Sequence, residues 1–196
     1  MLLQIHIAGA KRSGKTTVAR IVLQELRAQG FRAVIFDTDP IRQALLRAAH
    51  GVRNESVEAP IGSELNKEFH PKACRRLFEA KIPRALKAGK TPIVTATHSR
   101  PWWYEEAERV AKQYSAKLRF IVLETPSLEE TVRRAREDTS RSDTKDLTNP
   151  VQLEAYLAST ASFNATYAGF QKEHLLLRQN TPEVMARIAL EYILQK

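Results

Sequence analysis

The chain has 196 residues, of which 43% are hydrophobic and 27% are charged. This balance predicts one folded domain, residues 1–196, and excludes global disorder and a fibrous repeat. The single cysteine, Cys74, excludes an intrachain disulfide and a cysteine zinc cluster and favours a reducing, cytoplasmic setting. No apolar run approaches the roughly 20 residues of a membrane-spanning helix. The formal net charge of +9 favours anionic partners, nucleic acid among them, although a basic surface kept for solubility explains it equally well.

Short apolar runs typical of strands alternate with longer stretches of helical spacing along the chain. The predicted strands are, in chain order, 3–8, 33–36, 92–96, 118–123 and 174–177. Helix starts are indicated at Pro150 and Pro182, each preceded by a capping residue, and by a capping box of Ser127 and Glu130. This alternation predicts an α/β fold with right-handed crossovers, a mainly parallel sheet and helices on both faces.

The segment between the first strand and the first helix satisfies the phosphate-binding pattern G-x-x-x-x-G-K-[ST]. Its glycines let backbone N–H groups turn toward a bound phosphate, and the following helix adds the positive end of its dipole. Lys15 is expected to reach the β- and γ-phosphates, and Thr16 to offer its hydroxyl to Mg²⁺. The predicted nucleotide contacts here are Gly9, Ala10, Lys11, Arg12, Ser13, Gly14, Lys15, Thr16 and Thr17.

The second strand ends in two carboxylates, Asp37 and Asp39, and then turns into a helix. With Pro40 as the first helical residue, Asp39 is expected to cap the helix and to share one face of its first turn with Arg42, at the carboxyl edge of the sheet. One interpretation makes Asp39 only a cap and Arg42 a solvated residue. The other makes Asp39 a proton acceptor and Arg42 a contact to the acceptor or the phosphoryl group, and the loop upstream favours it.

Four segments together resemble the small P-loop kinases: the phosphate-binding loop, the Asp37–Arg42 segment, the strand 93–97 and the arginine-rich stretch after Leu128. That superfamily includes adenylylsulfate kinases, polynucleotide 5′-hydroxyl kinases, gluconate kinases, zeta-type toxins and antibiotic phosphotransferases. The resemblance covers nearly the whole chain in motif order, and only the loop is a specific pattern. It implies a three-layer α/β/α fold with a five-stranded parallel sheet in the order 2-3-1-4-5. It also implies ATP and Mg²⁺ as cofactors, Asp39 as general base and Arg42 as a substrate or phosphoryl contact.

The third strand departs from this resemblance. Some relatives carry an acid at the position that Thr95 occupies in this chain. Asp37 is one candidate to hold the hydration shell of Mg²⁺ in its place. Glu124, at the end of the next strand, is the other candidate, and it is more simply explained as a polar strand-end residue. The metal ligands predicted from the sequence are therefore Thr16 and Asp37.

An arginine-rich segment follows the capping box, and we expect it to form a short lid over about 133–148. Guanidinium groups bind phosphate bidentately and stay charged, and in the resembling kinases this segment closes over ATP. Arg133 and Arg134 are adjacent on a helix, so both cannot face the nucleotide. Arg134 and Arg141 are the predicted nucleotide contacts, with Arg134 also catalytic, and an exposed basic helix is the alternative.

Two further segments are expected near the ligands. Thr97, His98 and Arg100 follow the third strand and are predicted to project into the acceptor cleft, although a loop histidine is more often a structural hydrogen-bonder. Trp102 and Trp103, just beyond, are expected to pack against neighbouring helices rather than stack on a base. Thr181 precedes the last helix, where the loop of similar kinases touches adenine, and it is also a good helix cap.

The leading hypothesis is an ATP- and Mg²⁺-dependent kinase that transfers the γ-phosphoryl group to a hydroxyl of a small molecule, nucleotide or nucleic acid. A GTPase-like switch is the first alternative, and the absence of an Asn-Lys-x-Asp guanine motif speaks against it. A nucleic-acid-dependent ATPase is the second, disfavoured by the missing acid on the third strand. The sequence does not choose the phosphoryl acceptor or the oligomeric state.

Overall fold

The computed structural model describes residues 2–52, 64–98, 100–137, 147, 149–168, 170 and 172–195, with the side chain of Asn66 left out. Arg141 and most of the predicted lid segment therefore lie outside the described residues. Within the described part, no helix is long and apolar enough to cross a membrane.

One parallel sheet of five strands forms the centre of the molecule, in the order β2-β3-β1-β4-β5. The strands are β1 (Leu3–Gly9), β2 (Ala33–Asp37), β3 (Thr91–Ala96), β4 (Lys117–Leu123) and β5 (Leu175–Leu177). Each begins and ends within one residue of its predicted range. The strand order implied by the resemblance is confirmed.

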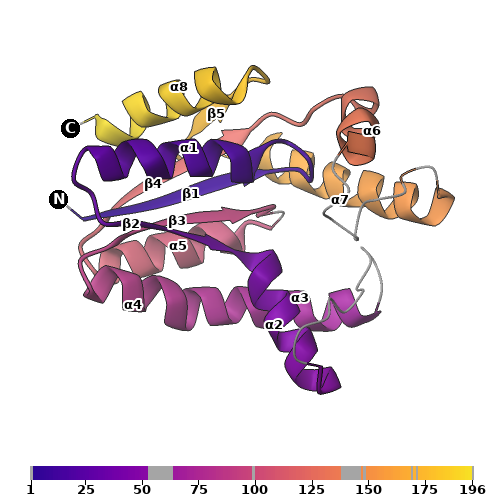
Figure 1. Ribbon diagram of the computed structural model, residues 1–196, viewed down its shortest axis with the longest axis horizontal. Helices are drawn as coiled ribbons and strands as arrows, with labels where there is room; N and C mark the ends of the chain where they lie inside the picture. The colour runs from indigo at the N-terminus through magenta and orange to yellow at the C-terminus, as the bar shows by residue number, and fades with distance from the viewer. Residues whose placement is uncertain are drawn as a thin grey trace.

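Helices cover both faces of the sheet, with α1 and α8 on one face and α4 and α5 on the other (Figure 1). The helices are α1 (Lys15–Ala28), α2 (Thr38–His50), α3 (Glu64–Arg76), the π-helix η1 (Leu77–Lys81), α4 (Ile82–Lys87), α5 (Trp102–Gln113), α6 (Leu128–Glu137), α7 (Pro150–Ala168) and α8 (Pro182–Leu194). Successive side chains of a strand point to opposite faces. On β1, accordingly, Ile5 and Ile7 pack with α1 and α8, while His6 stacks on Phe78 of η1 across the other face. The three-layer α/β/α architecture is confirmed.

The helix starts agree with the sequence at two prolines and differ at α2. Helices α7 and α8 begin at Pro150 and Pro182 as predicted. Helix α2, however, begins at Thr38, and its cap is Asp37, whose Oδ1 accepts a hydrogen bond from the Asp39 backbone N–H at 3.0 Å. The prediction that Asp39 caps this helix is wrong. The backbone leaves its extended conformation directly after Asp37, and proline is tolerated within the first turn because N–H groups there have no helical partner.

The capping box before α6 is only half formed. The Ser127 hydroxyl accepts from the Glu130 backbone N–H at 3.2 Å, as the pattern predicts. The Glu130 carboxylate does not return to Ser127, because the guanidinium groups of Arg133 and Arg134 lie within 2.7 Å and 2.6 Å of it. A carboxylate binds charged donors more strongly than a single backbone N–H. Glu130 therefore pairs with two arginines of its own helix instead of completing the capping box.

Candidate functional site

The phosphate-binding loop connects β1 to α1 at the carboxyl edge of the sheet, and two glycines are needed for its shape. Gly14 has φ of 92°, in the left-handed region that side chains disfavour. A Cβ atom at Gly9 would collide with the Ser13 hydroxyl. The loop can therefore close tightly over β1 only with glycine at both positions.

Donors within this loop converge on one small space. The Lys15 ammonium donates to the Gly9 and Ala10 carbonyls at 3.0 Å and 2.7 Å, so its side chain folds back over the loop. The Ser13 hydroxyl is buried and has no hydrogen-bond partner among the described residues. Buried polar groups without a partner are rare in folded proteins and indicate a missing ligand or water. A phosphate oxygen is a suitable acceptor for this set of donors.

Two oxygen ligands suited to Mg²⁺ lie side by side next to the loop. The Thr16 hydroxyl, at the start of α1, is 3.4 Å from Asp37 Oδ2 at the end of β2. Asp37 is paired in register with Thr95 of β3, the position that carries the acid in relatives with an acid on this strand. In this chain the acid therefore lies on the neighbouring strand, β2. The Thr95 hydroxyl is buried without a partner in the described part of the chain. These hydroxyl and carboxylate groups have the chemistry that Mg²⁺ requires.

Glu124, the other acid left open by the sequence, lies elsewhere. It is exposed, and its carboxylate accepts a hydrogen bond from the Gln179 backbone N–H at 3.1 Å. It thus joins the end of β4 to the loop after β5. Among the two candidate acids, only Asp37 contacts Thr16.

A cavity of about 590 Å³ adjoins the loop and has the size of a small-molecule site. Three segments distant in sequence form its walls: the loop with the start of α1, helix α6, and the connection from β5 to α8. Its lining residues are Arg12, Gly14, Lys15, Thr16, Thr17, Arg133, Arg134, Glu137, Asn180, Pro182 and Met185. These are the three segments that the sequence assigned to nucleotide binding.

The prediction for Thr181 is only indirectly met by this cavity. Its neighbours Asn180 and Pro182 line the wall, whereas Thr181 itself is not among the lining residues. The Thr181 hydroxyl caps α8 by accepting from the Val184 N–H at 3.4 Å. The capping role expected for Thr181 is confirmed, and contact with a base stays a prediction.

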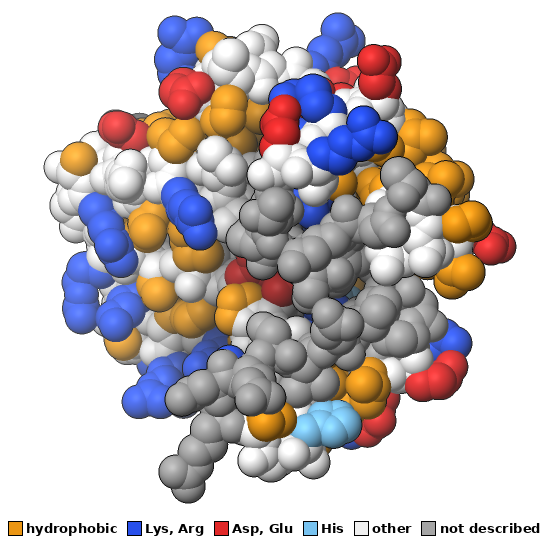
Figure 2. Space-filling view, turned by 45° about the vertical axis from the view of Figure 1, so that its right-hand side comes forward, with side chains coloured by type: hydrophobic (Ala, Val, Ile, Leu, Met, Phe, Trp, Pro, Cys, Tyr) orange, Lys and Arg blue, Asp and Glu red, His pale blue; other side chains and the backbone are white. Residues whose placement is uncertain are grey.

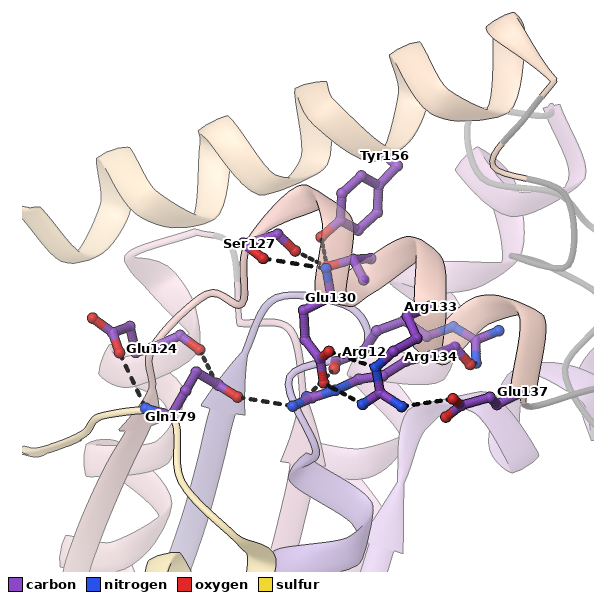
Figure 3. A network of polar contacts seen from close by, with 10 residues as sticks. Arg12, Glu124, Ser127, Glu130, Arg133, Arg134, Glu137, Tyr156 and Gln179 are labelled. Carbon is purple, nitrogen blue, oxygen red and sulfur yellow. Dashed lines mark hydrogen bonds and ion pairs between the residues drawn. The ribbon is translucent and has the colours of Figure 1, made fainter.

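A polar network joins the loop to helix α6 (Figure 3). The Arg12 guanidinium donates to the Arg134 carbonyl at 3.1 Å, and the Arg134 guanidinium donates to the Arg12 carbonyl at 2.8 Å. Arg134 is also paired with Glu130 at 2.6 Å and donates to Gln179 Oε1 at 3.3 Å. Hydrogen bonds from Arg133 and Arg134 lower the pKa of Glu130 to about 2, so that its carboxylate stays charged.

The two adjacent arginines of α6 have different partners, as the sequence argument required. Arg134 reaches the phosphate-binding loop, whereas Arg133 is held by Glu130 and by Glu137 at 2.6 Å. Gln179 is a residue that the sequence argument did not single out. It binds both Arg134 and the Glu124 backbone, and only its place beside Thr181 signalled it.

The acceptor side of the edge begins with Asp39 and Arg42 on the first turn of α2. Arg42 Nη2 is 3.4 Å from Asp39 Oδ1, which confirms that the two share a helix face. The Arg42 side chain is 5% exposed and that of Asp39 is 41% exposed, so the carboxylate is the group that solvent or substrate can reach. Figure 2 shows basic side chains scattered over the described surface in that view, among hydrophobic and acidic ones, and the net charge of the whole chain is +9.

Charged groups from several elements act together on this side. Burial, together with the positive charges of Arg42, Lys11 and Arg100 and against the negative charge of Asp39, lowers the pKa of His70, on α3, to about 4. The segments that carry Lys11, Asp39 and Arg100 therefore face a common region beside α3. Cations outnumber the single carboxylate among these groups.

His98 does not project into an open cleft as the sequence predicted. The residue has φ of 51° and its side chain is buried, with the ring centroid 4.4 Å from that of Trp103. Aromatic packing between β3 and α5 draws the imidazole inward. Thr97 is half-buried and Arg100 is exposed. Trp103 is buried and Trp102 is half-buried, and their rings lie 5.3 Å and 6.3 Å from that of Phe78 on η1, so the expectation that these tryptophans pack against neighbouring helices is confirmed.

Solved structures of small kinases are similar to this chain over nearly its whole length. The APS kinase CysC of Mycobacterium tuberculosis, in complex with AMPPNP and APS, is 18% identical, with a TM-score of 0.65 and coverage of 99% of this chain and 98% of that chain. A gluconokinase from Sinorhizobium meliloti is 13% identical, with a TM-score of 0.58 and coverage of 97% and 91%. A sugar kinase from Janibacter is 18% identical, with a TM-score of 0.63 and coverage of 98% and 94%. These likenesses confirm the small P-loop kinase fold.

No curated protein sequence matches the chain. A family model does match, and its extent includes the phosphate-binding loop, the paired Asp39 and Arg42, and helix α6. Because the model described as an AAA domain covers residues 5–164, the chain belongs to the AAA domain family.

Proposed function

We propose that this protein is an ATP-dependent phosphotransferase that moves the γ-phosphoryl group to a hydroxyl of an acceptor molecule. The observation that carries the proposal is the cavity of about 590 Å³, in which Lys15, Thr16 and Arg134 meet around the phosphate-binding loop. The similarity to solved kinases, one of them in complex with AMPPNP, supports it.

The loop residues would bind the phosphates of ATP by charge and by backbone donors. Lys15 would exchange its loop carbonyls for phosphate oxygens, and Arg134 would neutralise charge from the opposite wall of the cavity. Thr16 and Asp37 would hold Mg²⁺ through oxygen atoms, directly or through its waters. When bound, the metal would supply positive charge that offsets the negative charge of the phosphates.

Asp39 would act as the general base because its carboxylate is the accessible acid on the acceptor side. In the transfer, the acceptor oxygen forms a bond to the γ-phosphorus while the bond from that phosphorus to the β,γ-bridging oxygen breaks. The hydroxyl proton passes to Asp39, and ADP leaves. Arg42, held against Asp39 at 3.4 Å, would orient this carboxylate and offset charge on the transferring group.

Phosphoryl transfer from γ-labelled ATP to a panel of acceptors tests the proposal. The panel comprises gluconate, APS, nucleosides, oligonucleotides with a 5′-hydroxyl, and aminoglycosides, with Mg²⁺ present or chelated. We expect label in one acceptor class and none when the metal is removed. Label in none of the acceptors, combined with hydrolysis stimulated by nucleic acid alone, would contradict the proposal.

A further inference from the structure

Three buried polar side chains form a chain through the core toward the acceptor side. Gln4, His6 and His98 are 0%, 0% and 1% exposed. The Gln4 Nε2 atom is 2.9 Å from His6 Nε2, and His6 Nδ1 is 3.1 Å from His98 Nε2. The chain thus runs from the interior of β1 to the residue that lies two positions beyond the end of β3.

The direction of these hydrogen bonds follows from one backbone carbonyl. Gln4 Nε2 lies 3.0 Å from the Ala107 carbonyl, which can only accept, so the amide nitrogen faces this side and donates to His6 Nε2 as well. His6 must then carry its proton on Nδ1 and donate to His98 Nε2. His98, accepting at Nε2, carries its own proton on Nδ1.

Both imidazoles stay neutral, so each keeps one donor nitrogen and one acceptor nitrogen. Burial lowers the pKa of His6 to about 3, and burial, with the nearby His6, Lys15 and His70, lowers the pKa of His98 well below 6.5. The His6 ring is stacked between Phe78 and Phe120, with centroids at 5.9 Å and 5.6 Å. Each ring is therefore held in one tautomer and one orientation.

The Gln4–His6–His98 chain of hydrogen bonds ends in a donor, the His98 Nδ1–H. His98 Nδ1 is buried and has no hydrogen-bond partner among the described residues. Nε2 faces His6 of β1, so Nδ1 lies on the side of the ring nearer the His98 backbone, which follows the carboxyl end of β3. The positive charge of Lys15 acts on His98, while His70 nearby is subject to the positive charges of Arg42, Lys11 and Arg100 and to the opposing negative charge of Asp39. A buried N–H close to a cation suits an oxygen atom that carries negative charge.

We propose that the Gln4–His6–His98 chain fixes the His98 Nδ1–H as a hydrogen-bond donor to an oxyanion group of the phosphoryl acceptor. This inference rests on the proposed kinase function, and it adds that the acceptor carries a carboxylate, sulfate or phosphate group besides its reacting hydroxyl. His98 is the substrate-contacting residue in this arrangement, and Gln4 and His6 are positioning residues.

Nitrogen-15 NMR of the full chain, labelled in its histidines, tests the arrangement directly. We expect one-bond N–H coupling at Nδ1, and not at Nε2, for both His6 and His98. Inorganic sulfate is the probe for the oxyanion, added with Mg²⁺ and AMPPNP so that the phosphate-binding loop is already filled. The His98 Nδ1–H signal should move with sulfate, while that of His174, which faces the Lys172 carbonyl, should not.

The outcomes separate this inference from the proposed function. Failure of AMPPNP to bind would contradict the kinase proposal itself. Two outcomes would overturn only the present inference, provided that AMPPNP binds. One is an Nε2–H tautomer at His98, and the other is a His98 signal that does not change when sulfate is added.

Variants give a second readout, the affinity for sulfate measured by calorimetry in the presence of AMPPNP. His98→Ala should weaken sulfate binding about 10-fold, as expected for loss of a hydrogen bond to a charged group. His98→Asn, whose amide can place a donor near the Nδ1 position, should restore most of that affinity. His6→Phe keeps the stacking but frees the tautomer, and should give an intermediate loss.

The matched control is His174→Asn, which should leave the sulfate affinity unchanged. Melting curves of all variants show whether each is folded before its affinity is compared. Equal sulfate affinity in folded His98→Ala and wild-type protein would overturn the inference, because sulfate would then bind at a different basic site. The tautomer measurement on the wild-type protein holds even if a variant does not fold.

Discussion

The nucleotide side and the acceptor side of the sheet edge are built from different interactions. On the nucleotide side, partly exposed arginines and backbone carbonyls hold each other, as Arg12 and Arg134 do at 3.1 Å and 2.8 Å. On the acceptor side, neutral imidazoles are buried among aromatic rings, and His6 and His98 meet at 3.1 Å. Phosphates are bound by positive charge, whereas recognition of an acceptor needs donors held in one place. The predictions below test this contrast, from the largest expected effect to the smallest.

Lys15→Ala should remove the central charge of the nucleotide side. We expect phosphoryl transfer to fall by about 10³-fold or more, because a charged donor to the transferring group is lost. The melting temperature should change little, since the Lys15 ammonium donates to carbonyls of the loop and is not part of the hydrophobic core. Steady-state rates and a melting curve on the same preparation measure both effects, and full activity in the variant would contradict the kinase proposal.

Asp39→Asn tests the base on the acceptor side. We expect kcat to fall by roughly 10²- to 10⁴-fold with little change in the affinity for ATP, because asparagine cannot take the proton. Stability should hold, since the cap of α2 is Asp37 and the lost ion pair with Arg42 involves a carboxylate that is 41% exposed.

The matched control for the base is Asp37→Asn. Asparagine caps a helix about as well as aspartate, so α2 should remain stable. This variant should instead weaken the affinity for Mg²⁺ and so raise the Mg²⁺ concentration that activity requires. The reason is that the Asp37 carboxylate, lost in the variant, lies 3.4 Å from Thr16 Oγ1. An unchanged kcat in Asp39→Asn would assign the proton transfer to another group.

Acid should destabilise the folded protein through histidines on the acceptor side. Three histidines there, His6, His70 and His98, have lowered pKa values in the folded protein, with burial as the largest cause. The unfolded chain therefore binds more protons than the folded chain below about pH 6.5, and stability falls as the pH falls. The loss should be roughly 4 kcal/mol between about pH 6 and about pH 5, given about 1.4 kcal/mol for each of the three groups and pH unit.

Urea unfolding at the two pH values measures this loss. His70→Gln should reduce the pH dependence by about a third, because it removes one of the three titrating groups. A stability that is the same at both pH values would show that these imidazoles are already accessible to protons in the folded state.

Arg134→Ala should have the smallest effect of the four. We expect the KM for ATP to rise about 10-fold, the size of one charge-assisted contact to phosphate. Arg136→Ala, on the exposed face of the same helix, is the control and should leave the KM for ATP unchanged. A similar rise in both variants would indicate a general field of the basic helix rather than a specific contact.

Local patterns in the sequence determined the sheet and the phosphate-binding loop. A strand, a glycine-rich turn and a helix follow one another within 3–28, so the chemistry of that segment is carried by neighbouring residues. The five strand ranges were predictable for the same reason, because each is a short apolar run, whereas the order of the sheet was implied by the resemblance to the small P-loop kinases. The role of Arg134 was half predictable, since adjacent helical residues must face different directions.

Tertiary structure alone decided the cap of α2 and the place of His98. Asp37 and Asp39 are equally good caps by composition, and only the backbone conformation at the end of β2 chose Asp37. His6 and His98 are 92 positions apart, and no local pattern indicates that packing across two strands and α5 brings their rings together. Hydrogen-bond direction in the Gln4–His6–His98 chain depends on a carbonyl of α5, Ala107, which the sequence does not place near β1. Long-range packing, rather than local propensity, therefore determines which imidazole nitrogen carries the proton.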